Sequence, residues 1–408
     1  MTPRTIYSGA WASSLRFRDF RLFWVSTFFY SVGTGMEHVA VGWLVFDITG
    51  SAFMVGVAAA ARMAPLFFLG ILSGAMADWL ERRLFLLFSA LGGVAVAAIM
   101  AMLLLSGDPP VWAVVVLVAA GGCVFAFTLT TRNAYTYDIV GSEHALNGLS
   151  LNQMAMQVGG IAGALASGAL IELVGPGWQY LGVGGSYLGS ALILLVIGRS
   201  ARTAEPQREP VLRNLVGYIR FLRENRVIMA LMCLTSITEV LGFSHMTMLP
   251  VFAKEVLHVG PAGLGYLTAV RQAGGLLGLA LLANLRDYRR KGLLMFIIAT
   301  AFGIGLMGFS LSTALVYFIV VLAAVNACAM SVDTLYKTLM QSNVPDEQRG
   351  RAMGSWVLSI GVAPVGHLGV GGLATALGAQ GALLVNGAML AGVSLVAAIG
   401  LPKIRRLE

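Results

Sequence analysis

The chain is short of charge. Only 11% of its 408 residues are Asp, Glu, Lys or Arg, against about 25% in a typical soluble domain, while 58% are hydrophobic. A soluble globular fold is excluded, because too few charged side chains remain for a water-exposed surface. The net charge of +8 does not indicate nucleic-acid binding, since the basic residues lie in short loops between apolar runs.

Cysteines and catalytic motifs are also scarce. Cys123, Cys233 and Cys328 are single and far apart in apolar runs, so neither a disulfide framework nor a metal site is expected. The sequence contains no GxxxxGK[ST] phosphate loop, no HExxH motif and no nucleophile with a nearby base. We therefore expect no cofactor, no ATP drive and no enzymatic activity.

Long apolar runs dominate what remains. About 20 mostly apolar residues cross some 30 Å of hydrocarbon, and twelve runs meet that length. The first begins near Phe20 and is too long for the roughly 7 to 15-residue apolar core of a signal peptide. The sequence predicts an all-α integral membrane protein with twelve transmembrane helices. The expected spans are 20–46, 52–74, 84–106, 111–133, 147–173, 180–198, 226–252, 263–284, 293–311, 313–335, 353–376 and 380–400.

One stretch of the chain occurs twice. Residues 56–83 align without a gap to the segment 209 places later. The repeat predicts two pseudo-symmetric six-helix bundles, 1–198 and 226–408, joined by a linker at 199–225 with an amphipathic helix. The offset places Gly56 on Gly265, Arg62 on Arg271, Asp78 on Asp287 and Arg82 on Lys291.

The basic residues also predict the orientation. Lys and Arg concentrate in short cytoplasmic loops of membrane proteins. With the N-terminus inside, the inner loops and tails carry 24 of the 27 basic residues, and only Lys254 is left outside. Arg62 and Arg271 fall within the membrane. Both termini are predicted to be cytoplasmic.

The loop after the second span carries a motif. It contains Gly74, Asp78, Arg82 and Arg83, with Glu81 where a glycine is usual, and 284–291 is a degenerate second copy. With the twelve spans and repeated halves, it resembles the major facilitator superfamily. Segments 209–222 and 350–354 are similar to the branch of the enterobactin exporter and of drug and macrolide efflux proteins. The resemblance implies a multi-pass secondary transporter of the bacterial inner membrane, expected to be a monomer.

The chain departs from the superfamily in two further places. The glycine-rich fifth span resembles that of the antiporters but lacks their Gly-Pro step. The buried arginine of the fourth span is expected to be missing, because Arg132 falls at the cytoplasmic end of the predicted helix. Small residues four apart predict close helix packing, as at Gly70 and Gly74, Gly159 and Gly163, and Gly274 and Gly278.

The motif predicts a cytoplasmic gate. Asp78 opposes the helix dipole at the end of its span and needs a positive partner, and Arg82 and Arg83 are about one turn away. The acid and base pattern recurs at the second site, which favours a latch that ties helix ends together in one state. In the alternative the arginines only set topology by facing lipid phosphates. The predicted gate residues are Asp78, Arg82, Arg83, Asp287, Arg290 and Lys291.

Charges inside the spans indicate a central cavity. A charge near mid-membrane costs roughly 2.5 to 3.5 kcal/mol on insertion scales, so each must face a cavity or a partner. These residues fall in matching spans of the two halves, where such folds place their substrate site. The predicted cavity residues are Glu37, His38, Arg62, Glu239, His245 and Arg271, with His367 as a weaker candidate.

Glu37 is the first choice for proton coupling. Burial disfavours an ionised carboxylate and so favours proton uptake, whereas a permanent ion pair with Arg62 is the alternative. Glu239 has the same two interpretations against Arg271. Histidines titrate near neutrality but often only pack, and arginines do not deprotonate, so they would bind anions or hold the carboxylates ionised.

The predicted function is proton-coupled export of a moderately hydrophobic small molecule, drug-like or siderophore-like, by alternating access. Its partners are this substrate, protons and the lipid bilayer. Two alternatives stay open: a lipid or solute uniporter or importer with structural carboxylates, and a membrane receptor of the same fold without transport.

Overall fold

The computed structural model describes residues 10–77, 81–107, 109–198, 221–285, 288–312, 314–345 and 348–407. The side chains of 10–12, Phe68 to Ala77, Thr130 and Ser142 are not described. Asp78, Asp287 and nearly all of the predicted linker helix lie outside the described residues. Contacts divide the chain into two compact units, Met1–Leu44 with Phe68–Pro206 (unit 1) and Val45–Phe67 with Gln207–Glu408 (unit 2).

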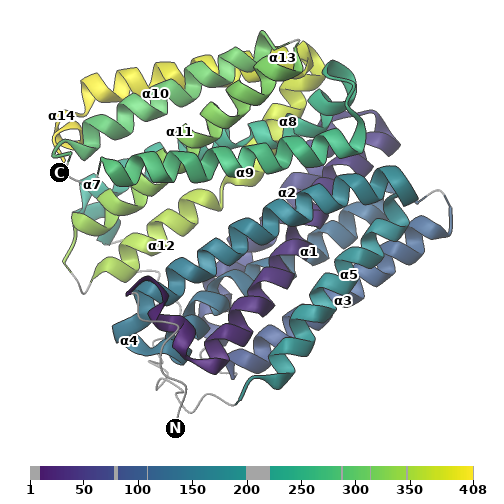
Figure 1. Ribbon diagram of the computed structural model, residues 1–408. Helices are drawn as coiled ribbons and strands as arrows, with labels where there is room; N and C mark the ends of the chain where they lie inside the picture. The colour runs from purple at the N-terminus through teal and green to yellow at the C-terminus, as the bar shows by residue number, and fades with distance from the viewer. Residues whose placement is uncertain are drawn as a thin grey trace. The chain divides into compact units, whose positions relative to one another are not determined.

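Unit 1 is a bundle of long helices. Its elements are η1 (Ala10–Arg16), α1 (Arg18–Thr49) as far as Leu44, α2 (Ala52–Ala77) from Phe68, α3 (Arg82–Leu105), α4 (Val111–Val174) and α5 (Pro176–Val196). Helix α3 packs against α4 and α5, and α3 and α5 run side by side in Figure 1. Gly141 turns α4 between two of the predicted spans with φ 74°, a conformation that glycine adopts at little cost.

Glycine lets α1 approach the second part of α4. A Cβ on Gly159 would lie 2.7 Å from the carbonyl oxygen of Phe28, and one on Gly163 would overlap the carbonyl of Val32. The close packing predicted from the spacing of Gly159 and Gly163 is therefore confirmed. Glu37 lies on the same helix and is held near α4 by this contact.

Unit 2 is also helical. Its elements after Gln207 are α7 (Arg226–Thr238), η2 (Glu239–Phe243), α8 (His245–Val251), η3 (Phe252–Val256), α9 (Gly260–Asn284), α10 (Lys291–Ser310), α11 (Leu315–Ser342), α12 (Arg349–Ile360), α13 (Ala363–Gly400) and α14 (Pro402–Arg405). Helix α10 packs against α13 and α11, and α11 against α9 (Figure 1). Gly274 and Gly278 of α9 meet the backbone of Ala323 and Ala327 in α11, as their spacing predicts.

The predicted seventh span is not a uniform α-helix. It runs from Arg226 to Val256 but contains two π-helical turns, η2 and η3, on either side of α8 with its internal Pro250. Such π turns widen the helix locally and are frequent at functional sites. Glu239 is the first residue of η2.

Residues 45–67 pack within unit 2. Gly56 lies against the carbonyl of His367, where a Cβ would be 2.5 Å from the oxygen, and the ring of Phe67 lies against Gly361. Lys254 Nζ is 2.5 Å from Asp47 Oδ1. The two contact units therefore divide the chain at other places than the sequence repeat does. The six-helix bundles 1–198 and 226–408 remain a prediction.

The all-helical membrane fold is confirmed for the part of the chain that the structure describes. Nine helical stretches there are long and apolar enough to cross a membrane, and Ala52–Phe67 is a shorter apolar helix. One stretch, Arg349–Gly400, contains two predicted spans with Gly378 (φ 73°) between them. The number of twelve spans stays a prediction.

Candidate functional site

Glu37 is enclosed by two other helices of unit 1. Its side chain is only 6% exposed, and the hydroxyl of Tyr187 on α5 donates a hydrogen bond to Glu37 Oε2 at 2.8 Å. On the other side, a Cβ on Gly121 of α4 would lie 2.5 Å from Glu37 Oε1. The carboxylate therefore fits a space that only a glycine leaves open, and it has a defined hydrogen-bond donor.

Tyr187 is itself held in a slot. A Cβ on Gly33 of α1 would lie 2.8 Å from its ring, and one on Gly93 of α3 would lie 2.9 Å away on another ring edge. The Tyr187 ring also contacts that of Tyr30, with 5.5 Å between centroids. Because α1 and α3 both pack against this ring, its hydroxyl is positioned toward Glu37.

Arg132 corrects the sequence prediction. It was expected at a helix end, but α4 continues past it to the turn at Gly141, and its side chain is only 2% exposed. Its guanidinium donates to Thr27 Oγ1 at 2.8 Å and to Ser190 Oγ at 3.1 Å. Unit 1 thus has a buried arginine in its fourth span, as the superfamily pattern requires.

The Arg132 guanidinium also lies on aromatic rings. It is 4.3 Å from the Tyr30 ring centroid and 5.5 Å from that of Phe23. Since Tyr30 in turn contacts Tyr187, the contacts run without a break from Arg132 to the Glu37 carboxylate. We call these residues the Glu37 cluster, with members Phe23, Thr27, Tyr30, Glu37, Arg132, Tyr187 and Ser190.

This cluster holds a buried acid and a buried permanent cation on a partly aromatic path. The donor at Glu37 is a neutral hydroxyl, which can satisfy the carboxylate when it is ionised and can accept from it when it is protonated. Both protonation states therefore have a partner, as a proton carrier needs. The guanidinium keeps its positive charge. Its hydroxyl and aromatic partners are neutral, so none of them supplies a negative charge to balance it.

Two of the predicted cavity residues are not assigned to this cluster. His38, the neighbour of Glu37, is half-buried. Arg62 is 5% exposed but belongs to unit 2, whereas Glu37 belongs to unit 1. A pairing of Glu37 with Arg62 stays a prediction.

Glu239 has different surroundings in unit 2. It is half-buried at the start of η2 and makes no hydrogen bond or ion pair with another described residue. Asp333 and Lys337 of α11 are the charged groups that act on it electrostatically. Arg271, the partner expected from the repeat, does not pair with it.

Asp333 and Lys337 form a built arrangement with Trp356 of α12. Lys337 Nζ lies 2.8 Å from Asp333 Oδ2, and the Trp356 indole N–H donates to Asp333 Oδ1 at 2.7 Å. The same ammonium lies 3.9 Å from the Trp356 ring centroid. We call Asp333, Lys337 and Trp356 the Asp333 cluster. The sequence analysis did not identify these three residues.

The other predicted cavity residues of unit 2 each contact a different partner. His245 is 1% exposed, with Nδ1 2.7 Å from the Gly242 carbonyl oxygen, and its ring stacks on Phe309. His367 Nδ1 is 2.8 Å from Thr247 Oγ1. Arg271 Nη1 lies 3.4 Å from the sulfur of Met246, and its Nε has no hydrogen-bond partner among the described residues.

The predicted gate is described only in part. Arg82 pairs with Asp138 of α4 at 2.7 Å, and Arg83 donates to the carbonyls of Leu194 and Leu195 in the last turn of α5. The side chains of Arg290 and Lys291 make no hydrogen bond or ion pair with the described residues. Since Asp78 and Asp287 lie outside these residues, the latch stays a prediction, and Asp138 is an acid that the sequence analysis missed.

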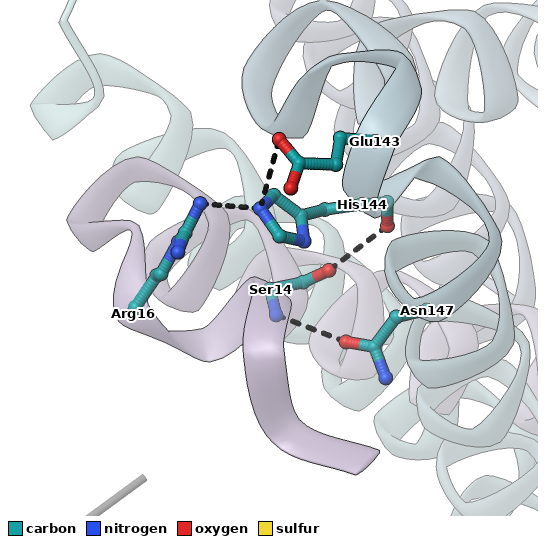
Figure 2. A network of polar contacts seen from close by, with 5 residues as sticks. All are labelled: Ser14, Arg16, Glu143, His144 and Asn147. Carbon is teal, nitrogen blue, oxygen red and sulfur yellow. Dashed lines mark hydrogen bonds and ion pairs between the residues drawn. The ribbon is translucent and has the colours of Figure 1, made fainter. Parts of the chain in front are cut away.

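A second polar network joins η1 to α4 just after the turn at Gly141 (Figure 2). The backbone N–H of Ser14 donates to Asn147 Oδ1 at 2.9 Å, and its hydroxyl donates to the His144 carbonyl at 3.1 Å. Arg16 contacts His144 Nε2, which also lies 4.0 Å from a carboxylate oxygen of Glu143. The segment before α1 is thereby fixed to the second part of α4.

The fold is shared with solved structures from the class of membrane transporters. It matches the nucleoside transporter NupG (D323A mutant) with a TM-score of 0.75 and 15% identity, covering 95% of this chain and 100% of that one. It matches a D-xylose-proton symporter with a TM-score of 0.72 and 15% identity, covering 92% and 96%. These likenesses establish the fold alone.

Within that class, the chain belongs to the family described as transmembrane secretion effector, which matches residues 8–408. It is 26% identical over 389 residues to the multidrug efflux pump Tap of Mycolicibacterium fortuitum, covering 92% of this chain and 94% of the relative. It is 24% identical to the enterobactin exporter EntS of Citrobacter koseri, covering 86% and 85%. It is 21% identical to the staphyloferrin A transporter of Staphylococcus aureus strain NCTC 8325 / PS 47, covering 85% and 87%.

The resemblance inferred from the motifs is therefore confirmed. The chain is a multi-pass membrane transporter with efflux-type relatives and is not an enzyme. Its family implies a small-molecule substrate. Among the described residues, no group of His, Cys, Asp and Glu side chains has the arrangement of a metal site.

Proposed function

We propose that the protein exports a moderately hydrophobic small molecule across the bacterial inner membrane in exchange for protons. It would work as a monomer, with both termini cytoplasmic and its two halves alternating in access. The observation that carries the proposal is the buried Glu37 carboxylate with the Tyr187 hydroxyl as its donor. The efflux and export names of the relatives support the direction.

The order of events follows from the Glu37 cluster. In one state Glu37 carries a proton and can donate it in a hydrogen bond to the Tyr187 oxygen. In the other state it releases that proton while Tyr187 donates to the carboxylate. The Arg132 charge favours release, since a nearby cation stabilises the ionised form, and the aromatic rings between the two groups keep them from forming a permanent ion pair.

Transport in proteoliposomes with an imposed pH gradient tests the proposal. Ethidium serves as a cationic aromatic probe and chloramphenicol as a neutral one, each with wild type, Glu37→Gln and empty liposomes. We expect the gradient to drive at least one probe with wild type, and Glu37→Gln to abolish that drive. A Glu37→Gln protein that still couples probe movement to the gradient would refute the assignment of Glu37.

The second candidate function is a uniporter or importer that moves its substrate without proton coupling. The Asp333–Lys337 ion pair supports it, because a charge pair within a long helix can be structural and involve no proton movement. In that case probe equilibration would occur at equal rates with and without the gradient.

A further inference from the structure

The segment η1 is fixed to α4 by two kinds of contact (Figure 2). The buried Ser14 bonds to Asn147 Oδ1 at 2.9 Å and to the His144 carbonyl at 3.1 Å, and neither bond involves a charged group. The other contact joins the guanidinium of Arg16 to His144 Nε2. Only this second contact can respond to pH, because histidine gains a charge near neutrality.

The Arg16 contact defines the protonation state of His144. A guanidinium has N–H donors and no acceptor, so Nε2 must accept with its lone pair. His144 is therefore neutral while η1 is docked, with its ring proton on Nδ1. A proton on Nε2 would direct one N–H against another and place two positive charges in contact. Docking of η1 thus excludes a protonated His144.

The charged groups around His144 do little to offset that repulsion. Glu143 Oε2 lies 4.0 Å from Nε2, but the Glu143 side chain is 87% exposed, so water screens it. Arg21 of α1 adds positive charge, since its Nη1 donates to the carbonyls at the end of η1. The other charged residues of α1 and α4 near these positions in the chain are Arg18, which is exposed, Asp19, which lies against Gly198, and Asp138, which pairs with Arg82.

The segment η1 leads directly into the helix that carries Glu37. Helix α1 has its own bond to the second part of α4, from the Trp24 indole N–H to the Leu151 carbonyl at 2.8 Å. This bond involves no titratable group and lies beyond η1 along the chain. Loss of the Arg16 contact would therefore release η1 and the start of α1 while the rest of α1 stays in place.

We propose that η1 and His144 form a pH-sensitive clamp, in which neutral His144 holds η1 on α4 and protonated His144 repels Arg16 and releases it. The docked state binds no proton on His144 and the released state can bind one. Docking is therefore favoured at higher pH and is lost as the pH falls through the range in which imidazole titrates. The predicted topology places this clamp on the cytoplasmic side, where the proposed exchange delivers protons. Acidification there would loosen the start of α1.

Hydrogen–deuterium exchange with mass spectrometry tests the clamp. The purified full-length protein in detergent is labelled at about pH 7.5 and about pH 5.5, on either side of the range in which most histidines titrate. Labelling times are corrected for the intrinsic pH dependence of exchange. We expect the peptide that contains Ser14 and Phe17 to lose protection about tenfold at the lower pH, because two charges then repel each other. Peptides of α3 and α5 should keep their protection and so exclude general unfolding.

Variants separate charge from packing. His144→Gln keeps an acceptor for Arg16, and His144→Phe keeps the ring contact with Phe17, whose centroid is 5.7 Å away. Both side chains stay neutral, so both variants should lose the acid response, as should Arg16→Gln. Glu143→Gln should keep the response or enlarge it, because a nearby negative charge is removed. His258→Gln, which changes an exposed histidine of unit 2, is the matched control and should respond as wild type does.

Three results would overturn the clamp. The first is equal protection of η1 at both pH values in wild type. The second is an acid response that persists in His144→Gln and His144→Phe. The third is loss of protection at both pH values in these two variants, because the imidazole itself and not its charge would then hold η1. The measurement uses neither substrate nor gradient, so its outcome is independent of the proposed export.

Discussion

Glu37 and Glu239 are both carboxylates in long apolar helices, yet their surroundings differ. Glu37 is enclosed, with a neutral donor at 2.8 Å and a glycine that leaves room for its other oxygen. Glu239 makes no such bond, starts a π-helical turn and acts on an acid and a base at once. The first carboxylate has a fixed hydroxyl donor, and the second has no such donor among the described residues.

This difference indicates a division of labour. A carboxylate with a hydroxyl partner can gain and lose a proton while its surroundings stay unchanged, which suits coupling. A carboxylate without a fixed donor among the described residues lacks that arrangement. Acids in corresponding spans can thus serve different steps, and the predictions below test that separation.

The largest expected effect is a difference in transport between variants of the two acids. Glu37→Gln should reduce gradient-driven probe transport to the level of empty liposomes, because it removes the carboxylate that Tyr187 contacts. Glu239→Gln should keep more of that transport, because Glu239 has no such fixed donor among the described residues. Both variants are compared with wild type in the same proteoliposome assay, and equal losses would remove the distinction.

Tyr187→Phe should have the next largest effect. The change removes the hydroxyl that donates to Glu37 Oε2 but keeps the ring between Gly33 and Gly93. A hydrogen bond to a charged group is worth about 1.5 to 3 kcal/mol, which corresponds to a loss of roughly tenfold or more. We expect gradient-driven transport to fall by that factor. Tyr180→Phe, a buried tyrosine of the same helix, is the control, and equal losses in the two variants would argue against a role for the Tyr187 hydroxyl.

The sequence predicted the fold and pointed to both acids, because charged residues inside apolar runs are visible from hydropathy alone. Their partners were harder to find. Tyr187 lies 150 residues from Glu37 and looks like an ordinary membrane tyrosine until the glycines facing its ring are known. Arg132 was assigned to a helix end because hydropathy falls at polar residues. The helix in fact continues to Gly141.

The repeat also misled the search for partners. It placed an arginine near each acid, but Arg271 contacts Met246 and not Glu239. A linear repeat fixes which helices correspond and leaves open which face each helix turns to its neighbours. Asp333 and Trp356 could have been suspected only from their polar or aromatic character near the ends of predicted spans.

Packing around the Glu37 cluster should show in stability. A Cβ on Gly93 would lie 2.9 Å from the Tyr187 ring, whereas one on the adjacent Gly92 would meet only Val124 at an ordinary 3.5 Å. Gly93→Ala should therefore cost about 1 to 3 kcal/mol through overpacking and lower the unfolding temperature by several degrees. Gly92→Ala should be neutral or slightly stabilising in the same scanning-fluorimetry measurement. Equal shifts for the two neighbours would show that the Tyr187 slot is not tightly packed.

The smallest effect is expected where an ion pair is exposed. Lys254 and Asp47 in unit 2 are 2.5 Å apart, but their side chains are 37% and 54% exposed, while those of Arg82 and Asp138 in unit 1 are 19% and 10% exposed. Exposed pairs contribute about 0 to 1 kcal/mol, since water and salt screen them. Removing one partner of a more buried pair costs more, because the remaining charge is left without compensation. Asp47→Asn should therefore lower the unfolding temperature by less than Asp138→Asn does. Adding 0.5 M salt should remove the effect of Asp47→Asn but keep the effect of Asp138→Asn. A larger shift for Asp47→Asn would mean that the contact of residues 45–67 within unit 2 depends on this pair rather than on the close approach at Gly56.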